Sequence, residues 1–583
     1  MSELVAKDAL LLAVKAHKAG DLAQADRYYT AILEAIPNHP ATNHKMGILA
    51  VDVGRREDAI PFFKRATEAK ISLEKYWLSY MDALVQLGKT EEAKELLINA
   101  KAKDFSDKFI KQLTTLLFEG LSKLRNSAPK ASIDELLTLY NQKNYSSVVN
   151  QAHTLAKKYL KDAVLWNLYG SAAAQIGKLD AAIVAFEKVI LLKPDYAEAY
   201  SNLGLALQGQ SKLDQALRNY KIALSLKPDY PDAHYNLGNA LYYSGHLEDA
   251  IEAYHKAVAL QPDHADVYYN MGRLHWLRRD FVRAFELMEW RWKKKQGLIG
   301  IKLSSNKPIW SGRDKNKVFV WKEQGIGDEI MFASVFSDAH RKSKKLIVEC
   351  DKRLLPLYRR SFPKSIKFID DRKTINEKDY DAQIAIGSLP LTFRRELRDF
   401  ADASSGWLKA DARKVKGLRK KLEAQPNEKV IGITWFTNAS DPRSKRRNIP
   451  VDLFSKYLTQ IPAKYVNLQY GETVEDLSKM RSKFALDVSQ VDSIDLFNDL
   501  DGLAALISAC DIVISIDNAT VHLAGALGVD TRVLLPFAPD DRWGINQKDS
   551  YWYDSLTLYR QEIQGDWSNP LKELEHDLTT SPS

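Results

Sequence analysis

Apolar residues recur along the first half of the chain with the spacing of helices that bury one face. Between Ala163 and Arg291, leucine, alanine and aromatic residues return every three or four positions, with polar residues between them. Three successive segments align with one another: LWNLYGSAAAQIGKLDAAIVAFEKVILLKPDY, AYSNLGLALQGQSKLDQALRNYKIALSLKPDY and AHYNLGNALYYSGHLEDAIEAYHKAVALQPDH. The pattern predicts repeated pairs of antiparallel helices.

Small residues and prolines mark this repeat at a period of 34 residues. The glycines are Gly170, Gly204, Gly238 and Gly272, and the prolines are Pro194, Pro228 and Pro262. The small residues let two helix backbones approach, and each proline ends a unit. Since no unit buries its own apolar face, neighbours must stack into a solenoid. The period continues in weaker form at Gly20, Gly54 and Gly88, and we expect helices in the blurred stretch Lys101–Leu160. The repeat resembles the tetratricopeptide repeat (TPR).

The second half of the chain alternates short apolar runs with helical patterns, which is typical of parallel strands joined by crossover helices. The runs are Val318–Trp321, Leu346–Glu349, Ile366–Ile369, Ala382–Ile386, Val430–Thr434, Tyr465–Leu468, Ile512–Ile516 and Thr531–Leu535. The charge-rich stretch Asp411–Lys429 divides them into two series and is interpreted as a helix plus linker. We therefore predict an α-helical TPR solenoid followed by an α/β domain of two Rossmann-like lobes.

Composition narrows the function classes. The 583 residues carry a net charge of +9, a mild basic excess dispersed among acids, which suits an anionic ligand but not a nucleic-acid binder. The two cysteines, Cys350 and Cys510, lie in apolar runs, so we expect two buried thiols and neither a disulfide framework nor a cysteine zinc site. The start of the chain shows no secretory pattern, and no apolar run is long enough to span a bilayer, so we expect a cytoplasmic protein.

Three loops that follow predicted strands could bind a phosphorylated ligand. The first contains Gly325, Gly327, Asp328 and Glu329, where two glycines allow close approach of a ligand to a helix start. Alternatively, its acids simply interact favourably with the helix dipole. The second runs from Asn438 through Asp441 to Arg447; its cations suit phosphate, or form a solvated charge run.

The third loop, Ser515–Gly528, joins a buried strand to a helix that starts with small residues. The backbone N–H groups at such a start can bind a diphosphate. Asp517 could accept hydrogen bonds from sugar hydroxyls, and His522 could donate to a phosphate or be a structural histidine.

A row of amides suggests a peptide-binding face on the repeats. Asn202, Asn236 and Asn270 occupy one repeat position, two residues before the glycine. Such a row could pair with the backbone of an extended peptide whatever its side chains. The array resembles the repeat region of protein O-GlcNAc transferase, in which an asparagine ladder has this role. The alternative is that asparagine is merely tolerated on a helix surface.

Several motifs together resemble the bacterial proteins that join TPR repeats to a glycosyltransferase domain related to family nine, the heptosyltransferases. They are EWRW at Glu289–Trp292, PIWSG at Pro308–Gly312, EQGIGDEIMFA at Glu323–Ala333, DNATVHLAGALG at Asp517–Gly528, LLPFAPDDRWG with Tyr551-Trp552-Tyr553, and GDW at Gly565–Trp567. The resemblance implies a GT-B fold and sugar transfer from a nucleotide sugar; some members glycosylate flagellin. It divides the chain into N-terminal TPR-like repeats (1–160), TPR repeats (161–296), an N-terminal lobe (297–417) and a C-terminal nucleotide-sugar lobe (418–583).

The resemblance also assigns roles to residues. Asp328 matches the proposed catalytic base, with Glu329 as the alternative. The phosphate-binding cation falls among Lys445, Arg446 and Arg447, and the donor-binding segment comprises Asp517, Asn518, Ala519, Thr520 and His522, with Gly325 and Gly327 beside the donor. Asp541 stands where the family commonly has tryptophan, and Asn518 where it usually has threonine.

We find no Asp-x-Asp motif suited to a metal, so we expect metal-independent transfer with no cofactor besides the nucleotide-sugar donor, to a protein acceptor held by Asn202, Asn236 and Asn270. Two alternatives stay open: a non-catalytic TPR adaptor with a degenerate transferase domain, and a transferase that acts on a lipid-linked saccharide.

Overall fold

The computed structural model describes residues 3–103, 105–123, 128–294, 302–401, 405–422, 428–437 and 445–580. The chain divides into two compact units, Met1–Ala206 and Leu207–Ser583, and the division falls inside helix α12 (Ala197–Gly209). The domain boundaries expected after residues 160, 296 and 417 stay predictions, and the second of them lies outside the described residues.

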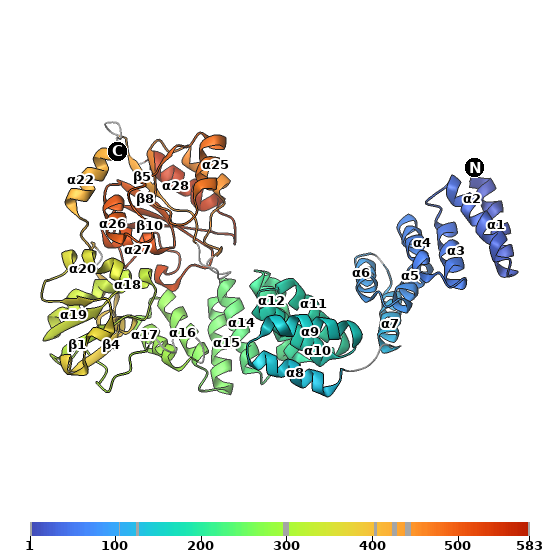
Figure 1. Ribbon diagram of the computed structural model, residues 1–583, viewed down its shortest axis with the longest axis horizontal. Helices are drawn as coiled ribbons and strands as arrows, with labels where there is room; N and C mark the ends of the chain where they lie inside the picture. The colour runs from blue at the N-terminus through green and yellow to red at the C-terminus, as the bar shows by residue number, and fades with distance from the viewer. Residues whose placement is uncertain are drawn as a thin grey trace. The chain divides into compact units, whose positions relative to one another are not determined.

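The first half of the chain consists of helices, as predicted (Figure 1). They are α1 (Glu3–Lys18), α2 (Leu22–Ala35), α3 (Pro40–Asp52), α4 (Arg56–Ala69), α5 (Glu74–Gln86), α6 (Thr90–Lys101), α7 (Asp107–Lys123), α8 (Lys130–Asn141), α9 (Tyr145–Lys158), α10 (Ala163–Gln175), α11 (Leu179–Leu192), α12, α13 (Leu213–Leu226), α14 (Pro231–Tyr243), α15 (Leu247–Leu260), α16 (Ala265–Leu277) and α17 (Phe281–Met288). Successive helices such as α3 and α4, α10 and α11, and α14 and α15 pack as pairs. The blurred stretch contains α7, α8 and α9, which confirms the helices expected there.

Glycine serves the repeat in two ways. Gly20, Gly54 and Gly88 end helices with φ of +82°, +81° and +69°, a conformation that residues with a Cβ rarely adopt. Gly238 lies inside α14, and a Cβ there would come within 2.5 Å of the ring of Tyr254 on α15. The small residue predicted at the helix seam is therefore required by close packing.

The N-terminal lobe is built on parallel strands. Within the described residues, β1 (Lys317–Trp321), β2 (Lys345–Glu349), β3 (Lys367–Ile369) and β4 (Ala382–Ala385) form a sheet of order β3-β2-β1-β4. Its α-helices are α18 (Ile326–Phe332), α19 (Phe336–Lys342), α20 (Leu355–Ser361) and α21 (Leu389–Phe393). The EWRW motif itself forms a short 3-10 helix (Glu289–Lys293), and further 3-10 helices follow several strands.

The C-terminal lobe has the order expected of a complete Rossmann-type sheet. Its strands are β5 (Val430–Ile433), β6 (Lys464–Asn467), β7 (Val488–Ser489), β8 (Ile512–Ile516), β9 (Thr531–Leu535) and β10 (Leu556–Arg560), in the parallel order β10-β9-β8-β5-β6-β7. Its helices are α22 (Ala412–Lys421), α24 (Val451–Leu458), α25 (Val474–Phe484), α26 (Leu500–Ser508), α27 (Ala519–Ala526), α28 (Ser568–Thr580) and the 3-10 helix η8 (Asp541–Trp543). Two Rossmann-like lobes of this kind confirm the predicted, GT-B-like fold class.

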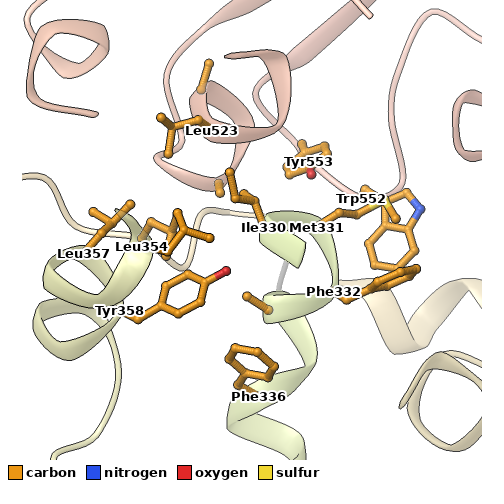
Figure 2. Close-up of a cluster of buried hydrophobic side chains, with 14 of the residues drawn as sticks. Ile330, Met331, Phe332, Phe336, Leu354, Leu357, Tyr358, Leu523, Trp552 and Tyr553 are labelled. Atoms are coloured by element: carbon orange, nitrogen blue, oxygen red, sulfur yellow. The ribbon is translucent and has the colours of Figure 1, made fainter. Parts of the chain in front are cut away.

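One hydrophobic core joins the last repeats to both lobes. Figure 2 shows Ile330, Met331 and Phe332 of α18 beside Leu523 of α27 and the Trp552-Tyr553 segment. The same core includes Trp276, Phe281 and Phe285 of the repeats, and the ring of Trp276 packs edge-on against Trp552 at 6.3 Å.

The EWRW motif fixes the junction to the N-terminal lobe. Arg291 is buried and donates to Glu289 at 2.5 Å, to Glu323 at 3.2 Å and to Ser388 at 2.6 Å. Glu323 and Ser388 belong to the loops after β1 and β4, so the junction contacts both. Cys350 and Cys510 are buried free thiols, as expected. The described helices include none long and apolar enough to cross a bilayer.

Candidate functional site

The strand orders identify where each lobe can bind a ligand. In both sheets the first strand lies between the second and the fourth, so the chain reverses its direction of progress between β1 and β4 and between β5 and β8. Ligands of doubly wound sheets bind at these switch points, beyond the carboxyl ends of the strands. The three loops singled out in the sequence follow β1, β5 and β8, and all three therefore begin at a switch point.

Asp328 lies in the first turn of α18 and contacts the opposite lobe. Its Oδ1 accepts a hydrogen bond from Nη1 of Arg542 at 2.6 Å, and its side chain stays 27% exposed. Arg542 belongs to η8, and its Nε donates to Asp540 at 3.1 Å. The candidate base of one lobe is thus paired with an arginine of the other.

Glu329, the alternative base, points elsewhere. Its carboxylate is buried and accepts the backbone N–H of Asp351, with N–O distances of 3.0 and 3.2 Å. Burial raises the pKa of Glu329 to about 8, so at neutral pH this group is mostly protonated. Glu329 thus holds the chain just after β2, at Asp351, whereas Asp328 faces the opposite lobe. This geometry favours Asp328 as the candidate base.

The two glycines of this loop differ. Gly327 faces α27 so closely that a Cβ on it would lie 2.9 Å from Cδ2 of His522 and 3.6 Å from Cα of Ala519. Gly325 precedes α18, is exposed, and a Cβ there would meet only Oδ2 of Asp328, at 3.4 Å. The first turns of α18 and α27 are therefore in direct contact, through Gly327.

His522 is fully enclosed by protein. Its Nδ1 lies 2.8 Å from the hydroxyl of Tyr553, and its Nε2 lies 3.3 Å from Nη1 of Arg542. Because arginine only donates, Nε2 accepts and the proton sits on Nδ1. Burial, helped by the Arg542 charge, lowers the pKa of His522 well below its usual value, so the ring is neutral. His522 supports Arg542 in this structure; the predicted donation to a phosphate stays a prediction.

The three cations expected to bind phosphate after β5 have different surroundings. Nη1 of Arg447 donates to the backbone oxygen of Asp517 at 3.0 Å and lies 3.5 Å from its carboxylate. Arg446 instead stacks over the ring of Tyr243 on α14, 5.2 Å from its centroid, and Lys445 is exposed. Arg447 is thus the cation nearest Asp517, whose pKa is raised by burial in spite of Arg447. Asn438, Ser440, Asp441 and Arg443 lie outside the described residues.

The start of α27 is capped by its own side chain. Asn518 accepts the backbone N–H groups of Thr520 at 2.9 Å and Val521 at 3.4 Å, and donates to Thr434 at 3.1 Å. Two of the N–H groups expected to bind phosphate are therefore already satisfied. Cα of Ala519 would lie 3.6 Å from a Cβ on Gly327, and Arg447 and Arg542 are the cations near this helix start.

The predicted amide row is partly engaged within the repeats. Asn202 donates to Asn167 at 3.4 Å. Asn270 uses both amide hydrogens, toward the hydroxyl of Tyr235 at 3.2 Å and Oδ1 of Asn239 at 2.7 Å. Asn236 is half-buried on α14. In this arrangement Asn270 could offer a peptide its carbonyl oxygen rather than its N–H groups.

The sequence analysis missed the Asp540–Arg542 segment as a part of the site. Burial opposes ionisation of Asp540, but the cations of Arg542, Arg273 and Arg447 outweigh it and hold its pKa below the ordinary range. Asp541 is buried and accepts from Tyr242 and Arg273, both on repeat helices. The available signal was that Asp541 stands where the glycosyltransferases that the sequence resembles commonly have tryptophan. Among the described side chains, no group of three or more His, Cys, Asp or Glu is arranged to hold a metal ion.

Comparisons with known proteins bear on the repeats. A family model described as the TPR repeat matches residues 170–211, 209–245 and 238–277. This match confirms that the chain contains TPR repeats, which commonly bind protein partners.

One curated protein is similar along almost the whole chain. Protein FlbA of Caulobacter vibrioides is 25% identical over 585 residues, a match that covers 96% of this chain and 81% of FlbA. Among solved structures, MamA from Desulfovibrio magneticus RS-1 is 23% identical, covering 29% of this chain and 97% of that chain with a TM-score of 0.26. The first TPR of Spaghetti (RPAP3), bound to an HSP90 peptide, is 22% identical and covers 19% of this chain and 89% of that chain, with a TM-score of 0.19. At these TM-scores neither structure supports an argument about this chain.

Proposed function

We propose that this protein is a metal-independent glycosyltransferase that moves a sugar from a nucleotide-activated donor to a protein acceptor recruited by its TPR repeats. The observation that carries the proposal is the contact between Asp328 and Arg542 across the two lobes, 2.6 Å long and beside the start of α27. A transferase of this kind needs a base for the acceptor hydroxyl and cations for the leaving phosphate, and these two residue types meet here.

The roles follow from the chemistry of the groups. Asp328 accepts the proton of the attacking hydroxyl. Arg542 and Arg447 neutralise the charge that develops on the nucleotide diphosphate as the sugar leaves, a task that a metal ion performs in other transferases. Before donor binding, both arginines lie against carboxylate residues, and a diphosphate replaces part of those contacts. The acceptor is a polypeptide because the chain devotes about half its length to repeats of a protein-binding type. A flagellin-type acceptor follows from the family resemblance alone.

The test is intact-mass analysis of candidate acceptors co-expressed with and without this protein, together with calorimetry of nucleotide sugars. Wild type should add one or more sugar masses. Asp328→Asn should lower transfer by roughly 10²- to 10⁴-fold, the usual contribution of a general base, and keep donor binding. The matched control is Glu329→Gln, which changes the neighbouring acid and should stay active because that acid is already protonated. An active Asp328→Asn protein rejects the base assignment, and the absence of any saturable nucleotide heat in wild type favours the adaptor.

A further inference from the structure

The 3-10 helix η8 is the point at which the repeats reach the candidate site. Oδ1 of Asp541 accepts the hydroxyl of Tyr242 at 2.7 Å, and Oδ2 accepts Nε of Arg273 at 2.7 Å. Tyr242 lies on α14 and Arg273 on α16, while Asp541 itself is 2% exposed. Both carboxylate oxygens are therefore committed to repeat helices.

The next residue along the chain, Arg542, faces the other way. It pairs with Asp328 of α18 and contacts His522 of α27. Its own neighbour Asp540 accepts from its Nε and is also influenced by the Arg273 charge. A short helix whose first side chain is fixed by the repeats thus presents its second side chain to the site.

We propose that Asp541 is a positioning residue through which the last repeats hold Arg542 against Asp328, so that α14 and α16 are part of the transferase site rather than only a recruitment surface. That Asp541 holds Arg542 in place rests on the contacts alone. That this matters for sugar transfer rests on the proposed function. Hydrogen bonds to an ionised carboxylate are stronger than those between neutral groups, and burial strengthens them further. Two such bonds can therefore hold the Asp541 side chain in one geometry.

One of these helix faces carries an amide expected to bind the acceptor, Asn270 of α16, and the other carries Asn239 of α14, which accepts a hydrogen bond from Asn270. Arg273 follows Asn270 by three residues on α16, and Tyr242 follows Asn239 by three on α14, so each pair shares a face. Asn270 and Asn239 are hydrogen-bonded to each other at 2.7 Å. A polypeptide bound along these faces contacts the helices that position Arg542, and this arrangement couples acceptor binding to the geometry of the donor site.

Two tyrosines provide a matched pair of variants. Tyr242→Phe removes the hydroxyl that Asp541 accepts at 2.7 Å. Tyr254→Phe, one helix later, removes a hydroxyl that Asn239 accepts at the same distance of 2.7 Å. Both rings are buried and both stay in place, so general loosening of the repeats should be alike. Only the first change acts on η8.

The first readout is hydrogen exchange of the full-length protein, which needs no donor. In Tyr242→Phe we expect exchange at η8 and α18 to speed up by roughly tenfold, the effect of one lost hydrogen bond to a charged group, and in Tyr254→Phe no change there. In the double variant Tyr242→Phe/Asp541→Asn, exchange at η8 and α18 should be little faster than in Asp541→Asn alone, since both changes act on one contact. Equal exchange at α18 in the two tyrosine variants overturns the proposal.

The second readout is calorimetric binding of UDP, GDP, ADP and CMP as probes. The nucleotide that binds wild type should bind Tyr242→Phe more weakly by roughly tenfold and Tyr254→Phe as in wild type. Unchanged affinity in Tyr242→Phe, with faster exchange at α18, shows that Asp541 only ties the repeats to the lobe and overturns the positioning role. If none of the probes binds wild type, the proposed function loses its support, while the exchange comparison still decides whether the repeats hold η8.

Discussion

Replacing Gly327 by alanine should loosen the contact between the lobes, whereas the same replacement at Gly325 should not. The two glycines are two residues apart in one loop and were predicted together as donor-binding. A Cβ at 327 would lie 2.9 Å from Cδ2 of His522, whereas a Cβ at 325 would lie 3.4 Å from Oδ2 of Asp328. Asp328 is a partly exposed side chain that can turn aside, and His522 is not.

The magnitude follows from how firmly His522 is held. Its two nitrogens contact Tyr553 and Arg542, and its ring stacks on Trp543 at 5.4 Å with an interplanar angle of 16°. Carbon atoms pack at about 3.5–4.0 Å, so α18 and α27 must separate by roughly 0.6–1 Å. Overpacking of this kind costs about 1–3 kcal/mol, and the better helix propensity of alanine returns at most about 1 kcal/mol. We therefore expect a net local destabilisation of roughly 1–2 kcal/mol.

Hydrogen exchange of α27 is the suitable measurement, because a chain with two compact units has no single unfolding free energy. In Gly327→Ala the amides of α27 should exchange roughly 5- to 30-fold faster, the factor that corresponds to 1–2 kcal/mol. In Gly325→Ala any change should be confined to the start of α18, where alanine is a poorer N-cap than glycine. Equal exchange of α27 in both variants refutes the packing argument.

Two further predictions concern single buried groups. Burial and the nearby Lys94 lower the pKa of Lys188 to about 7, below its value in the unfolded chain, so the stability of the first unit should fall as the pH drops from about 10 to 7. Lys188→Met should raise the melting temperature at pH 7 and should abolish the dependence of stability on pH between about 7 and 10, measured by denaturation at several pH values. If the pH dependence is unchanged in this variant, Lys188 is not its cause. Asn518→Ala should destabilise the start of α27 by about 1–2 kcal/mol, because the N–H groups of Thr520 and Val521 lose their acceptor while the Thr434 hydroxyl keeps its hydrogen bond to Ser515. Hydrogen exchange at the start of α27 measures this loss, and exchange like that of wild type contradicts the cap.

The fold could be predicted where the signal is local. Buried parallel strands appear as continuous apolar runs, and the eight predicted runs correspond to β1–β6, β8 and β9 within a residue or two. β7 has two residues and β10 alternates apolar with polar side chains at the sheet edge, so neither forms such a run. The 34-residue period was equally visible, because every unit repeats the same packing.

The site was only partly predictable, since its contacts are between residues distant in sequence. Asp328 and Arg542 are separated by 214 positions, and nothing near either residue indicates the other. Asn518 shows a different limit: an asparagine before a helix has the same sequence signal whether it caps the helix or binds a ligand. In the structure the side chain accepts two backbone N–H groups, so Asn518 is a helix cap.

The second compact unit, Leu207–Ser583, includes the last repeats as well as the two lobes, and its contacts explain why. The last repeats do not end at a polar surface, because Trp276 and Phe281 belong to the core that also contains Phe332 and Trp552. Buried polar contacts reinforce this core, from Arg291 to Glu323 and from Tyr242 to Asp541. Separating α14–α17 from the lobes would expose apolar surface to water and would break these buried ion pairs and hydrogen bonds, which is costly. The compact unit therefore begins within the repeats, and the helices nearest the lobes stabilise the candidate site as well as continuing the solenoid.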